Sequence, residues 1–221
     1  MAPAMRTLAP GAPLRSLQVT VLAPVPGGPV RAVARTLRSG KSTTHVEARI
    51  VDGDSTLALM VGIFGLPRTS TVTLRPRQPE TAAAEALELP WIPGVTPNFT
   101  QHFKARWLAG GPPWSGAGEP ENVIELAMRD TGNATEHHVL AMADFIPPIA
   151  LSYLKAPVPA ASLNWMLELV AEDVGSLPLD GWRIDAQMTA AHAGYINQSL
   201  TLWGPGGVAV ALGRQTMVAF G

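Results

Sequence analysis

The sequence predicts an α+β protein built from two related units in which antiparallel strands outnumber helices. Residues 8–17 (LAPGAPLRSL) resemble residues 154–163 (LKAPVPAASL) at one constant offset. Each copy is followed by alternating or apolar runs rich in β-branched residues and divided by short turns, which indicates antiparallel strands. Ahead of the second copy there is room for further strands and a helix, whereas only seven residues precede the first. A supersecondary unit that recurs within one chain is a signal at the level of the fold.

The first unit is expected to be a meander of four strands. They are predicted at 17–25, 30–38, 43–52 and 55–64. The turns between them are PGG at 26–28, SGK at 39–41 and DGD at 52–54, whose glycines suit tight connections. By comparison with the second unit, residues 1–8 should be the end of a helix.

The second unit is expected to hold one helix and six strands. The strands are predicted at 99–108, 123–130, 163–173, 182–192, 195–203 and 208–220, with a glycine-rich loop at 110–118 and a turn at 205–207. The helix is predicted over 145–155, because Pro147 and Pro148 suit a first helical turn and Asp144 is a typical N-cap residue. Six prolines in the stretch between the units indicate a linker, with a short helix allowed over 80–88. The predicted division is 1–66, linker 67–97, and 98–221.

Composition excludes several classes of function. The net charge is −1 and no basic stripe is present, so nucleic-acid binding is not expected. The chain has no cysteine, and its histidines lack the spacing of metal ligands, so no metal site is predicted. No apolar run is as long as a membrane span, and the N-terminus has no signal-peptide core. A cytoplasmic protein without membrane contact is therefore expected.

At this point the chain resembles the type II, TesB-like group of acyl-CoA thioesterases. The segments that carry the likeness are PLRSLQVTVLAPV (13–25), RTLRSGKSTTHVEARI (35–50), MADFIPP (142–148), ASLNWMLELV (161–170), DGW (180–182) and GRQTMVAFG (213–221). The resemblance covers most of the chain and implies a double hotdog, in which a long antiparallel sheet wraps around a central helix. It also implies an acyl-CoA substrate, no cofactor and a homo-oligomer.

The resemblance places three catalytic residues. Family members use an Asp near the start of the second hotdog helix, a Ser or Thr at the head of the next strand and a Gln on the last strand. These fall on Asp144, Ser162 and Gln215. Where the best-known bacterial members have Asp-His, this chain has Asn164-Trp165, which are taken as substrate-binding candidates.

Thioester hydrolysis requires an activated water and a polarised carbonyl, and it needs no covalent intermediate. Asp144 would accept the proton of the water or orient it, while Gln215 and Ser162 would fix its line of attack. Each residue also has a structural interpretation. Asp144 is fully explained as a helix cap, and Ser162 as the start of a strand, since its repeat partner Ser16 lies in a unit without an acid. A lone Gln215 in an apolar strand needs a hydrogen-bond partner if it is buried.

Two other functions remain open at this stage. A non-catalytic protein that binds acyl groups or small ligands would use the same fold, and the Asn164-Trp165 departure is compatible with it. A hotdog dehydratase usually pairs a histidine with an acid, and no histidine follows Asp144 on the predicted helix. The leading hypothesis is hydrolysis of acyl-CoA.

The first hotdog is expected to be incomplete at its N-terminus. Without its first strand and most of its helix, an apolar sheet face would be left uncovered. The inward positions are expected among Leu17, Val19, Val21, Leu59, Val61 and Ile63. An upstream segment or a partner chain would then cover this face.

Overall fold

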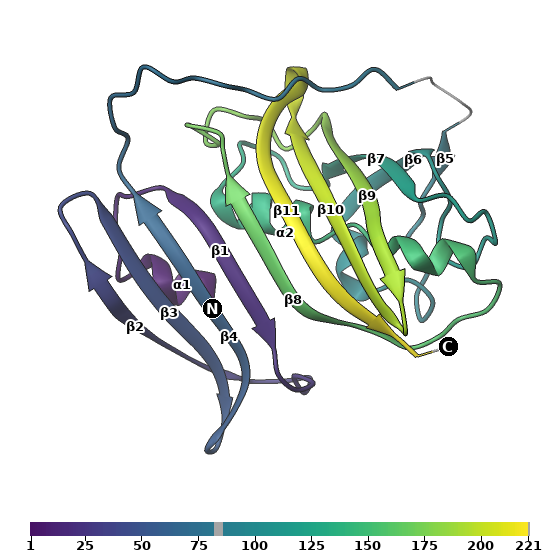
Figure 1. The fold of residues 1–221 in the computed structure, drawn as a ribbon, viewed down its shortest axis with the longest axis horizontal. Coiled ribbons are helices and arrows are strands. Elements are labelled where there is room, and N and C mark those ends of the chain that lie inside the picture. Colours follow the sequence, from purple (N-terminus) through teal and green to yellow (C-terminus); the bar gives the residue numbers. More distant parts are fainter. Residues whose placement is uncertain (82–85, 221) are drawn as a thin grey trace. The chain divides into compact units, whose positions relative to one another are not determined.

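The computed structural model describes residues 1–81 and 86–220. The chain forms two compact units, Met1–Leu74 with Ser162–Leu169 and Arg75–Ala161 with Val170–Gly221, here called unit 1 and unit 2. Every strand pairing recorded within each unit is antiparallel, and helices are short and few among these residues (Figure 1). The predicted α+β class is confirmed.

Unit 1 contains a sheet with the order β2-β3-β4-β1-β8. Its strands are β1 (Leu14–Val21), β2 (Arg31–Ser39), β3 (Thr43–Asp52), β4 (Ser55–Gly65) and β8 (Ala160–Leu169). The turns at 39–41 and 52–54 join neighbouring strands as predicted. The meander itself is wrong, because β1 pairs with β4 and not with β2. The glycines at 27 and 28 therefore belong to a longer connection between strands that are not neighbours.

A short helix, α1 (Ala2–Arg6), covers one face of the unit 1 sheet (Figure 1). Its Met5 is fully buried, and a Cβ atom on Gly62 of β4 would lie 2.5 Å from the Met5 Cε. The predicted helical N-terminus is thus confirmed, and Gly62 makes room for its docking.

The prediction of the covered face is partly wrong. Leu17 and Val19 pair with Gly62 and Met60, so these four positions share the face that Met5 contacts. Leu59, Val61 and Ile63, expected inward, alternate with Met60 and Gly62 and point to the opposite face. The error arises because β4 is apolar along nearly its whole length, so its periodicity does not distinguish the two faces.

Unit 2 contains a sheet with the order β11-β10-β9-β7-β6-β5. Its strands are β5 (Leu87–Glu88), β6 (Phe103–Ala109), β7 (Glu121–Met128), β9 (Trp182–His192), β10 (Tyr195–Gly204) and β11 (Val208–Ala219). The last three match the predicted strands closely, and the Pro205–Gly207 turn joins β10 to β11. The strand predicted at 99–108 begins later, because Asn98–His102 form a 3₁₀ turn, η1.

The helix predicted over 145–155 is wrong. The α-helix of unit 2 is α2 (Glu136–Ala143), which ends before the two prolines. Thr135 is its N-cap and forms a capping box with His138, whose Nδ1 accepts a hydrogen bond from the Thr135 N–H at 3.0 Å. Asp144 is therefore the C-cap of α2 and not an N-cap.

The prolines explain where α2 stops. In a continued helix, the N–H groups of residues 147 and 148 would bond to carbonyls four residues earlier, and proline has no N–H. The last bond of this kind runs from the Asp144 N–H to the Leu140 carbonyl at 3.2 Å. After Pro148 the chain forms a separate 3₁₀ turn, η2 (Ile149–Tyr153). Pro148 thus precedes a helical turn as expected, but a different and shorter one.

The stretch between the first four strands and unit 2 has no helix or strand over residues 66–81. Its later part is attached to unit 2, since Arg183 donates a hydrogen bond to the Pro79 carbonyl at 3.0 Å. Of the short helix allowed over 80–88, residues 82–85 lie outside the described residues, and 87–88 form β5. No helix within the described ranges is long and apolar enough to cross a membrane.

Replacing Gly62 with valine should destabilise unit 1. The added carbons would collide with Met5, and the new Cβ would also lie 3.3 Å from the Phe64 ring and 3.4 Å from a Leu14 methyl carbon. Overpacking of this kind costs about 1–3 kcal/mol of unfolding free energy, measurable by chemical denaturation. Gly40→Val is the control, because the nearest atom to a Cβ at that turn is 3.5 Å away. Equal stability of the two variants would contradict the docking of α1 on Gly62.

Candidate active site

Asp144 is held in place by the segment that surrounds it. Its backbone caps α2, which packs against β10 and β11. The next residue, Phe145, is buried, and its ring lies 5.0 Å from that of Phe103 and 6.1 Å from that of Phe99. Such tilted and edge-to-face aromatic pairs anchor a chain segment. The backbone at Asp144 is therefore held by packing both before and after it.

The Asp144 carboxylate has an unusual electrostatic environment. Desolvation by the surrounding protein raises its pKa from 3.8 to about 6. The residue as a whole is exposed, so solvent reaches it although the surrounding protein removes part of the hydration of its carboxylate. Within residues 1–81 and 86–220, the carboxylate has no hydrogen-bond donor or cation as a partner. A carboxylate in this state can accept a proton near neutral pH.

Gln215 is buried, with 8% of its surface exposed, and it lies on β11 directly opposite Gln198 of β10. Gln198 is 2% exposed, and its Nε2 donates to the Gln215 Oε1 at 3.4 Å. The cross-strand pairs on either side, Ile196 with Met217 and Leu200 with Gly213, carry no polar side chain. The predicted lone glutamine is thus one of two amides on an otherwise apolar face.

The Gln198 side chain also reaches the chain segment that follows α2. Its Oε1 accepts a hydrogen bond from the Ile149 N–H at 3.0 Å. Because Pro147 and Pro148 have no N–H, this is the first backbone donor after Ile146. The Ile149 N–H is therefore occupied and is not available to a developing oxyanion.

Sequence reasoning did not identify Gln198. The available signal was its position two residues from Ile196 and two from Leu200, which places a polar side chain on the buried face of a strand. The same signal supports Gln215 in β11, which the family resemblance selects.

The remaining predicted residues lie on β8. Ser162 is half-buried and marks the point where the chain passes from unit 2 to unit 1. Asn164 is exposed and pairs in register with Thr20, and Trp165 is half-buried and pairs with Val19. The indole Nε1 of Trp165 is buried and has no hydrogen-bond partner among the residues described. Asp144 and Gln215 thus belong to unit 2, whereas Ser162, Asn164 and Trp165 are grouped with unit 1.

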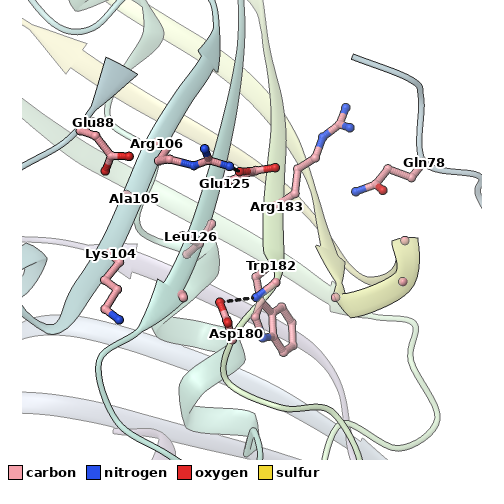
Figure 2. Close-up of a pocket in the computed structure, with 15 residues that line it drawn as sticks. Gln78, Glu88, Lys104, Ala105, Arg106, Glu125, Leu126, Asp180, Trp182 and Arg183 are labelled. Carbon is pink, nitrogen blue, oxygen red and sulfur yellow. Dashed lines mark hydrogen bonds and ion pairs between the residues drawn. The ribbon is translucent and has the colours of Figure 1, made fainter. Parts of the chain in front are cut away.

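A pocket of about 560 Å³ lies elsewhere in unit 2, over β6, β7 and β9 (Figure 2). Figure 2 shows Arg106 directed at Glu125, with which it forms an ion pair. Arg183 on the same side pairs with Asp185 at 2.5 Å. Acidic and basic groups are mixed in this pocket, so it does not favour a ligand of one charge. Neither Asp144 nor Gln215 lines it.

Comparison with solved structures identifies the fold. A protein of unknown function with a hot dog fold from Alicyclobacillus acidocaldarius matches with a TM-score of 0.85 and 18% identity, over 97% of this chain and 82% of that chain. Acyl-CoA thioesterase II TesB2 from Mycobacterium marinum matches with a TM-score of 0.75 and 17% identity, over 98% of this chain and 84% of that chain. The tesB protein of Mycobacterium avium subspecies paratuberculosis matches with a TM-score of 0.75 and 16% identity, over 98% of this chain and 82% of that chain. The predicted double hotdog is confirmed.

Family comparison covers both halves of the sequence, although no curated protein matches the chain. The model of the acyl-CoA thioesterase N-terminal domain matches residues 1–65. The model of the acyl-CoA thioesterase C-terminal domain matches residues 78–219. With both domains matched in order along its length, the chain belongs to the acyl-CoA thioesterase family and is a hydrolase of thioester bonds.

Proposed function

We propose that the protein hydrolyses acyl-CoA thioesters with a water molecule that Asp144 activates or orients, without a covalent intermediate. The water oxygen attacks the thioester carbonyl carbon while a proton passes to the Asp144 carboxylate. Collapse of the tetrahedral intermediate breaks the C–S bond, and the leaving CoA thiolate takes a proton from the Asp144 carboxylic acid. The products are a carboxylic acid and free CoA, and Asp144 returns to its starting state.

The observation that carries this proposal is the state of the Asp144 carboxylate. A well-solvated carboxylate or a member of an ion pair would have an ordinary or lowered pKa, whereas burial raises the pKa of Asp144 to about 6. A general base is most effective when its pKa lies near the working pH. The absence of a partner among the described residues leaves its oxygens available to a water molecule.

Gln215 and Ser162 are assigned supporting roles. Gln215 lies on β11, one of the two strands against which α2 packs, so it belongs to the part of unit 2 that also holds Asp144. Its amide would hydrogen-bond the water or the thioester oxygen and fix the geometry of attack. Ser162 would contribute its hydroxyl to the same water, an assignment that rests on the family resemblance. Asn164 and Trp165 are proposed to contact the acyl group.

Replacing Asp144 with asparagine tests the central role. The amide keeps the shape of the side chain and cannot accept a proton from water, so turnover of acyl-CoA should fall by about 10²-fold or more. The measurement is the release of free CoA thiol from a panel of acyl-CoAs. Asp130→Asn, at an exposed position after β7, is the matched control and should keep full activity. An Asp144→Asn variant with unchanged turnover would leave Asp144 with a structural role, and a wild-type protein that binds acyl-CoA without releasing thiol would instead be a binding protein.

The pH dependence of activity should follow the same carboxylate. Because the ionised form acts as the base, kcat/KM should rise with pH and level off above about 6, the pKa of Asp144. Any residual activity of Asp144→Asn should lack this step. A rate profile of the wild-type enzyme that is flat across this range would contradict proton transfer to Asp144.

Stability should change with pH in the opposite sense. The folded-state pKa of about 6 exceeds the ordinary value of 3.8, so folding favours protonated Asp144. That contribution is complete below the ordinary pKa and is lost as the pH rises through the folded-state value. At about pH 8, Asp144→Asn should therefore melt at a higher temperature than the wild type, and the difference should close toward pH 4. Thermal melting of both proteins across this range checks the sign.

A further inference from the structure

We infer that Gln198 is a positioning residue that fixes the orientation of the Gln215 amide, with the Gln215 Oε1 toward Gln198 and the Nε2 turned away from it. The inference rests on the proposed function for the meaning of Gln215, and it adds a residue and a direction that the function alone does not supply. It starts from three polar groups in a row: the Ile149 N–H, the Gln198 amide and the Gln215 amide.

The direction of this row is set by a backbone group. The Ile149 N–H can only donate, so the Gln198 atom that faces it at 3.0 Å must be the oxygen. The other end of the same amide is then NH₂, which donates to the Gln215 atom 3.4 Å away. That atom must be the Gln215 oxygen, and so the Gln215 NH₂ is directed elsewhere. One fixed donor thus determines the orientation of two side-chain amides that would otherwise be free to rotate by half a turn.

Burial makes the reversed arrangement unfavourable. Gln198 is 2% exposed and Gln215 is 8% exposed, so water is not available to replace a lost partner. A rotated Gln198 would set its NH₂ against the Ile149 N–H and its oxygen against the Gln215 oxygen. One contact would then place two donors against each other and the other contact two acceptors, both in an apolar layer. The native orientation is therefore the only one in which every group of the row is satisfied.

This orientation decides what Gln215 can do in the reaction. The Gln215 NH₂ carries two hydrogens, and in the proposed reaction one of them donates to a lone pair on the attacking water or to the thioester oxygen, on which negative charge develops. It cannot accept a proton from the water, so that role is left to Asp144. Gln198 itself does not contact the reacting atoms in this scheme. It acts through Gln215, because its side chain bonds both to Gln215 and to the backbone of Ile149, which follows Asp144 in the chain.

The test is a double-mutant cycle on the whole protein. The variants are Gln198→Leu, Gln215→Leu and the double change, with Gln198→Met as a second unbranched replacement that also lacks the amide. Removing an aligned donor lowers kcat by about 10²–10³-fold, which we expect for Gln215→Leu. Gln198→Leu should lower kcat by at least about 10-fold with KM little changed, and the double variant should be no slower than Gln215→Leu alone. Gln187→Leu, which removes an exposed glutamine of β9, is the control and should leave kcat unchanged.

Hydrogen exchange provides a readout that does not depend on activity. The Ile149 N–H should exchange slowly in the wild type, in Gln187→Leu and in Gln215→Leu, and faster in both Gln198 variants. Additive losses of kcat, or an Ile149 exchange rate that Gln198→Leu does not alter, would overturn the inference. A wild-type protein that releases no thiol from any acyl-CoA would refute the proposed function, while the exchange rates would still decide whether Gln198 holds the row of amides.

Discussion

The two consecutive prolines at 147 and 148 are the constraint on which the centre of unit 2 depends. They provide no N–H groups, so α2 cannot run on through them, and it ends at Ala143 with Asp144 as its C-cap. The exit places the Asp144 carboxylate at a helix end, beside the buried Phe145 ring. The next available backbone donor, on Ile149, is taken by Gln198. The acid and the amide pair are therefore positioned by one short segment whose conformation has few alternatives.

The sequence predicts the strands of this protein better than their arrangement. The turns at 39–41, 52–54 and 205–207 were recognisable because glycine and aspartate suit the backbone angles of tight hairpins, which are local properties. Pairing of β1 with β4 is a contact between distant segments, and no turn residue encodes it. Likewise, nothing in the periodicity of β4 reveals which of its two apolar faces α1 covers. The helix was misplaced because proline is compatible both with the start of a helix and with its end.

The candidate residues could also be predicted only as far as their own sequence positions allow, because their partners come from distant parts of the chain. Asp144 was selected through family resemblance, and its expected setting as an N-cap was wrong, although the structure gives it a carboxylate environment suited to proton transfer. Gln215 was also selected through family resemblance, and its place on an apolar strand predicted that it needs a hydrogen-bond partner if it is buried. That partner is Gln198, which satisfies the same criterion and is adjacent only through strand register. Whether Asp144, Ser162 and Gln215 act together stays a prediction, as does substrate contact by Asn164 and Trp165.

The amide pair also makes the two halves of the chain chemically unequal. The position of the first unit that corresponds to Gln215 by the matching FG at the strand ends is Leu59, a hydrocarbon side chain on the sheet face away from Met5. The two hotdogs thus share a scaffold, but the first has a leucine where the second has Gln215. The expected stoichiometry is one reaction centre per chain, not one per hotdog. Substitutions in the first hotdog would then affect the stability and assembly of the protein. Substitutions around β10 and β11 would affect the rate of hydrolysis as well.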